Sequence, residues 1–166
     1  MTIEIIKADL SNHDHAEAVI QLMSEYALDA MGGGQDLSKF VKQNLVAELS
    51  KRSSAHVVLA FVNHIPAGLA ICLEGFSTFA CKPLLNIHDL IVSFPYRGQG
   101  LSKLILQMAE TIAWDLGCCK LTLEVLDGNH AAKAAYKSFG FSGYELNPQM
   151  GHALFWEKKL SIAICP

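Results

Sequence analysis

Three residues, Arg97, Gly98 and Gly100, lie between an apolar segment and an amphipathic one, where a loop rich in backbone N–H groups can bind an anion. The two glycines lack a Cβ atom, so the backbone can take positive φ angles and turn several N–H groups toward one ligand. A helix that starts just after them would add its own unpaired N–H groups and the positive end of its dipole. This pattern predicts a phosphate-binding loop, but an ordinary turn between a strand and a helix is an alternative for so short a motif.

Apolar spacing predicts the elements around this loop. Residues 84–92 form an apolar run typical of a buried strand, and residues 100–116 have apolar side chains at helical spacing. Residues 120–125 alternate in polarity, which predicts a second strand. Residues 131–139 then predict a short helix with Asn129 at its N-cap. We therefore expect the loop to join a strand to the central helix of a strand, helix, strand, helix unit.

The N-terminal half is expected to supply more of the sheet. Residues 2–8 predict an edge strand, and residues 14–31 and 37–50 predict two helices. Residues 55–62 and 67–74 predict the two strands of a hairpin. This half of the chain therefore predicts antiparallel strands with helices packed on them.

The C-terminal segment, residues 144–160, contains two further strand candidates around a turn with Pro148 and Gly151. Taken together, the patterns predict a single domain over residues 1–166. Its class is α/β (α+β), with a mainly antiparallel sheet and a ligand site between strand and helix at its centre.

Two motifs resemble those of the GNAT superfamily of N-acetyltransferases. Residues 97–102 read Arg-Gly-Gln-Gly-Leu-Ser and are similar to the family's acetyl-CoA signature, Arg/Gln-x-x-Gly-x-Gly/Ala, with serine in the last position. Further along, Asn129, Ala132, Tyr136 and Phe141 resemble the family's second motif, in the same order. The resemblance is strongest over the central part of the chain, and a weaker one points to the diamine (spermidine/spermine) acetyltransferase branch.

The resemblance implies a specific fold around the loop. It implies a mixed, mainly antiparallel sheet of about seven strands flanked by about four helices. The sheet would splay apart at the acetyl-CoA site, between the strand that ends at Val92 and the strand that begins at Lys120.

The same resemblance implies direct transfer of an acetyl group from acetyl-CoA to a primary amine of a small cationic metabolite. Such a site needs a cofactor clamp, an oxyanion donor, a route for the amine's proton and an acid for the departing thiolate, but no metal. The main-chain N–H near Val92 is the implied oxyanion donor. The residues to which the resemblance assigns cofactor binding are Leu90, Ile91, Val92, Arg97, Gly98, Gln99, Gly100, Leu101, Ser102, Asn129, Ala132 and Tyr136.

Tyr136 is the implied acid, because the family has a tyrosine at this place whose hydroxyl reaches the cofactor sulfur. An unperturbed tyrosine pKa of about 10 lies above the 8.5 or so of a thiol, so hydrogen bonding to the sulfur without proton transfer is an alternative. Helical spacing places Tyr136 with Ala132 and Phe139, which also fits a core tyrosine. Asn129 can cap the helix and bind the pantetheine arm at once.

Two titratable residues, His88 and Asp89, interrupt the buried strand and are the other catalytic candidates. Strand alternation predicts that they point to opposite faces, so only one would look into the substrate site. His88 could accept the amine's proton or be a structural histidine. Asp89 could steer a cationic amine or anchor the loop.

Substrate-binding candidates come from two other segments. Glu74 and Phe76 would pair a carboxylate with an aromatic ring, which suits an ammonium ion, although a solvated turn with core phenylalanines is also consistent. Tyr26 lies before a glycine-rich stretch, residues 32–35, that predicts either a mobile lid over the acceptor or a plain linker.

Composition narrows the function classes further. The net charge of −3 over 166 residues argues against a nucleic-acid partner. No apolar run reaches the roughly 18 residues that span a bilayer, and the N-terminus lacks the pattern of a signal peptide, so we expect a cytoplasmic protein without a membrane partner. The five cysteines lack metal-ligand spacing, which predicts no metal site and favours buried, reduced thiols.

Two functions from different classes remain at this stage. One is an acetyl-CoA-dependent N-acetyltransferase whose acceptor is a diamine, an amino acid, an antibiotic or a protein amine. The other is a non-catalytic acyl-CoA-binding module on the same fold. A nucleotide hydrolase is disfavoured, because the loop lacks the Lys-Ser/Thr pair of a P-loop. Family habit and the apolar residues 154–156 predict a homodimer.

Overall fold

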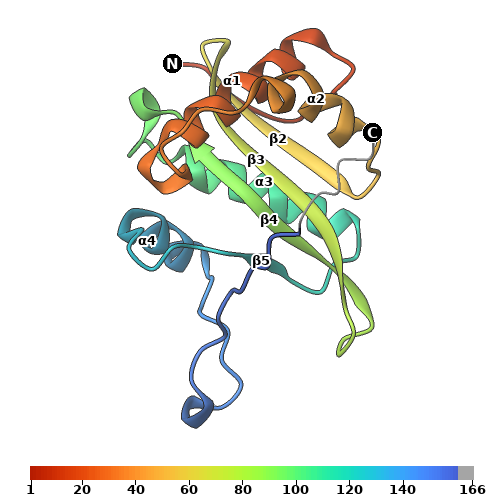
Figure 1. Cartoon of the computed structure of the whole chain (residues 1–166), viewed down its shortest axis with the longest axis vertical. Coiled ribbons are helices and arrows are strands. Elements are labelled where there is room, and N and C mark those ends of the chain that lie inside the picture. The colour runs from red at the N-terminus through yellow and green to blue at the C-terminus, as the bar shows by residue number, and fades with distance from the viewer. Residues whose placement is uncertain (161–166) are drawn as a thin grey trace.

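The structure is a computed structural model that describes residues 1–160 of the 166-residue chain. It contains one sheet with helices on both faces (Figure 1). Its strands are β1 (Ile3–Lys7), β2 (Ala55–Val62), β3 (Ile65–Ser77), β4 (Lys82–Val92) and β5 (Leu121–Leu123). Its helices are α1 (His13–Leu28), α2 (Lys39–Ser50), α3 (Leu101–Asp115) and α4 (His130–Phe139), with 3₁₀ turns η1 (Ala30–Gly32), η2 (Phe94–Tyr96) and η3 (Pro148–Met150).

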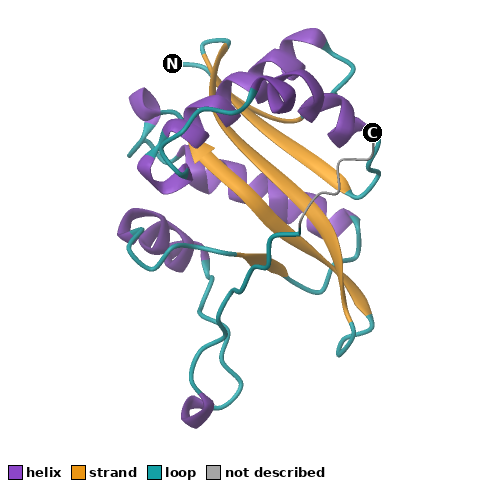
Figure 2. Cartoon of the chain, in the orientation of Figure 1, coloured by secondary structure: helices purple, strands orange, loops and turns teal. Residues whose placement is uncertain are grey.

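The sheet is mixed and mainly antiparallel, as predicted. Its strand order is β1-β2-β3-β4-β5, and only the β4–β5 pair is parallel. That pair is short, because it runs only from Leu85 opposite Leu121 to Ile87 opposite Leu123. Beyond Ile87 the two strands separate (Figure 2), which is the splay that the resemblance implied. The second half of β4 therefore has no strand on its β5 side among the described residues.

Two apolar cores lie on the two faces of the sheet, because β2 and β3 are buried on both sides. Val58 and Ala60 of β2 face α3, whereas Val57 and Leu59 face α1 and α2. Burying a valine or leucine side chain stabilises the fold by about 1.5–3 kcal/mol. The apolar stripe that α3 presents to the sheet is fully buried, so the helix that follows the loop is rigidly seated.

Gly68 of β3 allows α3 to approach the sheet closely. A Cβ atom at this position would lie 2.7 Å from Ile105 Cδ1 and 3.1 Å from the Ile91 carbonyl oxygen. The first distance is shorter than real Cβ contacts and the second is tight, so a side chain here would require Ile105 or the backbone of β4 to shift. The close approach holds the N-terminal part of α3 beside the end of β4, where the predicted site lies.

The C-terminal segment corrects the sequence-based prediction. Neither of the two strand candidates in residues 144–160 forms a strand, so the sheet has five described strands and not about seven. A strand needs a partner for its N–H and C=O groups, and the β5 edge offers only three residues. The apolar side chains of this segment are exposed, namely Tyr144, Leu146, Met150, Leu154, Phe155, Trp156 and Leu160.

Smaller differences concern helix ends and cysteines. Helix α1 ends at Leu28 rather than at residue 31, because Asp29 is extended and begins the turn η1. Cys72 is buried as predicted, but the prediction is wrong for Cys81 and Cys119, which are exposed, and Cys165 lies outside the described residues. No helix in the described chain is long and apolar enough to cross a membrane.

Candidate active site

The loop before α3 has the backbone geometry of an anion cradle. Gly98 and Gly100 have φ angles of 75° and 82°, as the sequence predicted. A Cβ atom added to either glycine would meet nothing within 4 Å, so the space in front of the loop is open. Within the described chain, none of the N–H groups of residues 98–102 donates to a protein acceptor. Helix α3 also has no side-chain cap, so its positive end faces the same space.

Arg97, at the start of the loop, is hydrogen-bonded to other parts of the protein. Its Nε donates to the Val92 carbonyl oxygen at 2.9 Å, and its Nη2 donates to Asp29 Oδ2 at 2.7 Å. Its guanidinium also lies 5.7 Å from the centre of the Phe94 ring. The backbone N–H groups are therefore left as the main anion-binding groups of the loop. No local pattern in the sequence links residues 29 and 97, so this ion pair follows only from the tertiary structure.

The open edge of β4 presents alternate backbone groups to the splay. The N–H of Ser93, just after β4, donates to the carbonyl oxygen of Ala67 in β3 at 2.9 Å. In an antiparallel pair the backbone groups of neighbouring residues alternate in direction, so those of Val92 and Leu90 point away from β3. Those of Ile91 point toward β3. Of the three predicted strand residues, Leu90 and Val92 therefore face the splay with their backbones.

A β-bulge at His88 decides which side chains face the acceptor side. Cys72 pairs with Ile87, but the preceding residue, Ile71, pairs with Asp89, so the register skips His88. Such a bulge interrupts the strict alternation on which the predicted opposite faces of His88 and Asp89 were based. Asp89 lies directly opposite Ile71, whose side chain belongs to the core under α1 and α2. His88 is exposed at the point where β5 departs.

Asp89 is a half-buried carboxyl without a protein partner. Burial raises its pKa above the ordinary value of 3.8, and the nearby His88 acts in the opposite direction. No N–H or O–H group of residues 1–160 hydrogen-bonds it. A half-buried charge of this kind is costly unless a ligand pairs with it. Tyr26 of α1 lies nearby, since burial and then the charge of Asp89 raise the pKa of that tyrosine.

Tyr136 lies on α4, across the splay from β4. Burial raises its pKa to about 12, and the neighbouring Tyr26 adds to the shift. Its ring packs edge-on against Phe141 at a centroid distance of 5.9 Å and contacts the core under α3. Asn129 caps α4, because its Oδ1 accepts from the Ala132 N–H at 3.2 Å, as predicted.

The structure does not bring Glu74 and Phe76 to this site. Glu74 lies opposite Leu85 on the face that α3 covers, and its Oε1 is 2.6 Å from Nε2 of the buried His56. Phe76 is exposed near the far end of the β3–β4 hairpin, opposite Pro83. That end of β4 is remote from the loop before α3 (Figure 1).

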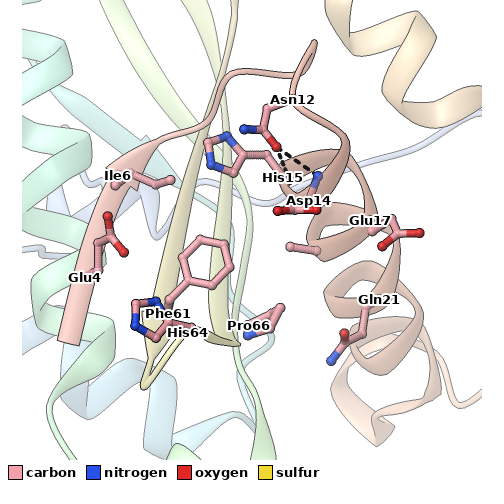
Figure 3. A pocket seen from close by; sticks show the side chains of 11 residues that line it. Glu4, Ile6, Asn12, Asp14, His15, Glu17, Gln21, Phe61, His64 and Pro66 are labelled. Carbon is pink, nitrogen blue, oxygen red and sulfur yellow. Dashed lines mark hydrogen bonds between the residues drawn. The ribbon is translucent and has the colours of Figure 1, made fainter. Parts of the chain in front are cut away.

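A pocket of about 410 Å³ lies elsewhere, between β1 and the first half of α1 (Figure 3). None of the predicted site residues lines it. Two of its polar side chains serve the fold: Asn12 caps α1, and His15 Nδ1 accepts from the Asp9 N–H at 3.1 Å. Among residues 1–160 no group of three or more His, Cys, Asp or Glu side chains is arranged to hold a metal ion.

Comparison with known proteins agrees with this geometry. The sequence model of the acetyltransferase (GNAT) family matches residues 19–141, well over half of the chain. The chain belongs to the GNAT family of acetyltransferases. A thialysine N-ε-acetyltransferase from Caenorhabditis elegans is 27% identical over 136 residues, which cover 77% of this chain and 78% of that protein. One from Bos taurus is 41% identical over 73 residues, or 44% of this chain and 42% of that protein.

A solved structure shows the same fold. AAC(6′)-Iy, in complex with the bisubstrate analog CoA-S-monomethyl-acetylneamine, has a TM-score of 0.76 to this GNAT chain at 14% identity. The match covers 96% of this chain and all of the other. Acetyl-CoA is the cofactor of the family, and the residues present fit it. The open space in front of Gly98 and Gly100 is where added Cβ atoms would lie, and the N–H groups there suit a pyrophosphate.

Proposed function

We propose that this GNAT protein is an acetyl-CoA-dependent N-acetyltransferase that acts on a primary amine of a small cationic molecule. One observation carries the proposal: the unpaired N–H groups of residues 98–102 stand next to the open edge of β4. One end of this arrangement suits a pyrophosphate, and the other suits an extended arm that contains amides. An ordinary turn between strand and helix would not need both.

The clamp divides the cofactor between two elements. The N–H groups of residues 98–102 bind the pyrophosphate, and the backbone groups of Leu90 pair with the pantetheine arm as an added strand would, which leaves the Val92 N–H for the thioester. The Val92 carbonyl is already taken by Arg97. Asn129 uses its Oδ1 to cap α4, so its Nδ2 remains to donate to a pantetheine carbonyl.

The chemistry then follows from the groups that face the splay. Acetyl-CoA supplies a thioester that a neutral primary amine can attack, forming the C–N bond as the C–S bond breaks. The Val92 N–H donates to the thioester oxygen as negative charge develops there. Tyr136 donates a hydrogen bond to the departing sulfur. With a pKa of about 12, its hydroxyl keeps its proton at neutral pH, which supports hydrogen bonding over full proton transfer.

The acceptor end supports a cationic substrate. Asp89 offers a half-buried carboxylate with no protein partner within the described chain, and Tyr26 stands beside it. An ammonium group would satisfy that carboxylate. His88, exposed next to Asp89, takes up the amine's proton through water in this scheme. Thialysine is a sulfur analogue of lysine with a terminal ammonium, and the curated relatives named for it support an acceptor of this type.

The test is release of free CoA thiol from acetyl-CoA in the presence of single amines. The panel contains thialysine, lysine, diamines, an aminoglycoside and a lysine peptide, with calorimetric binding of CoA measured alongside. Thiol release that depends on a small cationic amine supports the proposal and names the substrate. Release with the peptide alone would move the acceptor to proteins. CoA binding without turnover on any amine would favour a non-catalytic acyl-CoA module.

We also propose that the protein is a homodimer, whereas its cytoplasmic location stays a prediction. Two features support the dimer: the exposed apolar side chains of residues 144–160, and the edge of β5, which pairs with no further strand among the described residues. A soluble monomer rarely leaves so many large apolar side chains exposed together in one segment. A second copy would cover them.

A further inference from the structure

The ion pair between Asp29 and Arg97 joins two parts of the site that lie 68 residues apart in the chain. Asp29 follows α1, the helix that carries Tyr26 on the acceptor side. Arg97 begins the loop before α3, on the cofactor side. The Oδ2–Nη2 distance of 2.7 Å makes this a direct hydrogen bond between opposite charges.

Each partner is fixed by further bonds at its own end. The other oxygen of Asp29 accepts from the Met31 N–H at 2.9 Å, and its backbone carbonyl accepts from Gly32 and Gly34 at 2.9 and 3.1 Å. These bonds hold the turn η1 in place. On the other side, Arg97 holds the Val92 carbonyl. One chain of hydrogen bonds therefore runs from the turn after α1, through Asp29 and Arg97, to the end of β4.

We propose that Asp29 is a positioning residue that couples the acceptor side to the cofactor side through Arg97. This inference rests on the proposed function, because it assigns the two sides their ligands. CoA bound to residues 98–102 fixes the loop that Arg97 begins and, through the Arg97–Asp29 bond, the segment after α1, the helix that carries Tyr26. Bound CoA should then tighten binding of the amine, and by linkage the amine should tighten binding of CoA.

The pair is poorly placed to serve stability alone. Both side chains are partly exposed, and ion pairs of this kind add little to the free energy of folding. The same linker offers a matched comparison in Asp36, which pairs with Lys42 at 2.6 Å. That pair joins the linker after η1 to the first turn of α2 and involves neither the loop before α3 nor β4. The Asp36 pair is therefore also a carboxylate bonded to a cationic side chain, but it does not link the acceptor side to the cofactor side.

The experiment measures thialysine binding by calorimetry, with and without saturating CoA. The wild-type protein is expected to bind thialysine about tenfold more tightly when CoA is present. In Asp29→Asn, which keeps an oxygen for the Met31 N–H but loses the charge, this ratio should fall toward one. The melting temperature should change little. Asp36→Asn should keep the wild-type ratio, and Asp29→Glu, which restores the charge, should recover most of it.

An unchanged ratio in Asp29→Asn would overturn the inference, and so would a wild-type ratio of one. If Asp29→Asn fails to fold, Asp29→Glu decides, because a folded variant that keeps the charge but shows no recovery of coupling contradicts the proposed route. Failure of the proposed function is separate, since it would appear as no amine-dependent thiol release in the wild-type protein. If another amine of the panel gives the largest thiol release, that amine replaces thialysine as the probe.

Discussion

Single residues of this site combine a structural role with a chemical one. Tyr136 packs its ring against Phe141 and the core, and the same burial that secures the ring raises the pKa of its hydroxyl to about 12. The alternatives of a core tyrosine and a catalytic one are therefore compatible. A buried hydroxyl that holds its proton firmly is a dependable hydrogen-bond donor to a sulfur.

Tyr136→Phe tests the role of the hydroxyl, because it removes one oxygen and leaves the ring. We expect kcat to fall about 10- to 100-fold, the cost of a lost hydrogen bond to a charged group. The CoA dissociation constant should change less than threefold. Steady-state kinetics and calorimetry measure the two quantities, with Tyr144→Phe on an exposed tyrosine as the control. Equal losses in both quantities would assign Tyr136 to packing.

Asp89→Asn should separate stability from activity. The raised pKa of Asp89 means that the folded state binds this proton more tightly than the unfolded chain does. The free energy of unfolding of the wild-type protein therefore falls as pH rises above 3.8, the ordinary pKa of the aspartate carboxyl. The side-chain amide that Asp89→Asn introduces does not titrate, so the variant does not show this fall. We expect the variant to melt higher than wild type at pH 7 and nearly equally at pH 3.5. The acceptor kcat/KM should fall about 10- to 100-fold. A lower melting temperature at pH 7 would contradict this.

At the scale of elements, the site depends on how β4 pairs with its two neighbours. Its pairing with β5 stops at Ile87, and its pairing with β3 shifts register at His88. The sequence correctly predicts the strand, the helix after it and the cap of α4, because apolar period and cap residues are local signals. The bulge at His88 leaves no comparable signal. It places Ile87 with the core under α3 and Asp89 opposite Ile71 of the other core, a change of face that depends on the pairing with β3.

Asn129→Ala tests the start of α4, the helix that carries Tyr136. Loss of the hydrogen bond to the Ala132 N–H should lower the free energy of unfolding by about 1 kcal/mol. Asn129→Asp, which keeps the capping oxygen but replaces the free amide, should retain that stability. If the amide also binds the pantetheine arm, both variants should weaken CoA binding. Urea unfolding and calorimetry distinguish these results, and weak CoA binding in the alanine variant alone would leave Asn129 only its capping role.

At the scale of the whole molecule, the C-terminal segment leaves the body after α4 and runs past β5 with its apolar side chains exposed (Figure 1). The polarity pattern of residues 144–160 predicted strands, but a strand forms only where a partner edge exists. The described chain offers a three-residue edge. A second copy of the chain would supply a longer strand edge, with which residues 144–160 would pair.

Phe155→Ser combined with Trp156→Ser tests this assembly. We expect the wild-type protein to sediment at twice its chain mass of 18.1 kDa and the double variant to dissociate at micromolar concentration. Phe40→Ser, on an equally exposed aromatic of α2, should leave the dimer intact. A wild-type protein that sediments as a monomer at all concentrations would refute the dimer.

The sequence by itself determined the order of the elements, the glycine geometry of the loop and the family resemblance, because periodicity, caps and positive φ angles depend on neighbouring residues. The tertiary structure alone decided which groups meet. It placed Glu74 against His56, turned Arg97 toward Asp29 and set Asp89 on the side of Tyr26. These outcomes depend on packing between distant segments and on the register of β4, where one skipped residue changes the face of every side chain that follows.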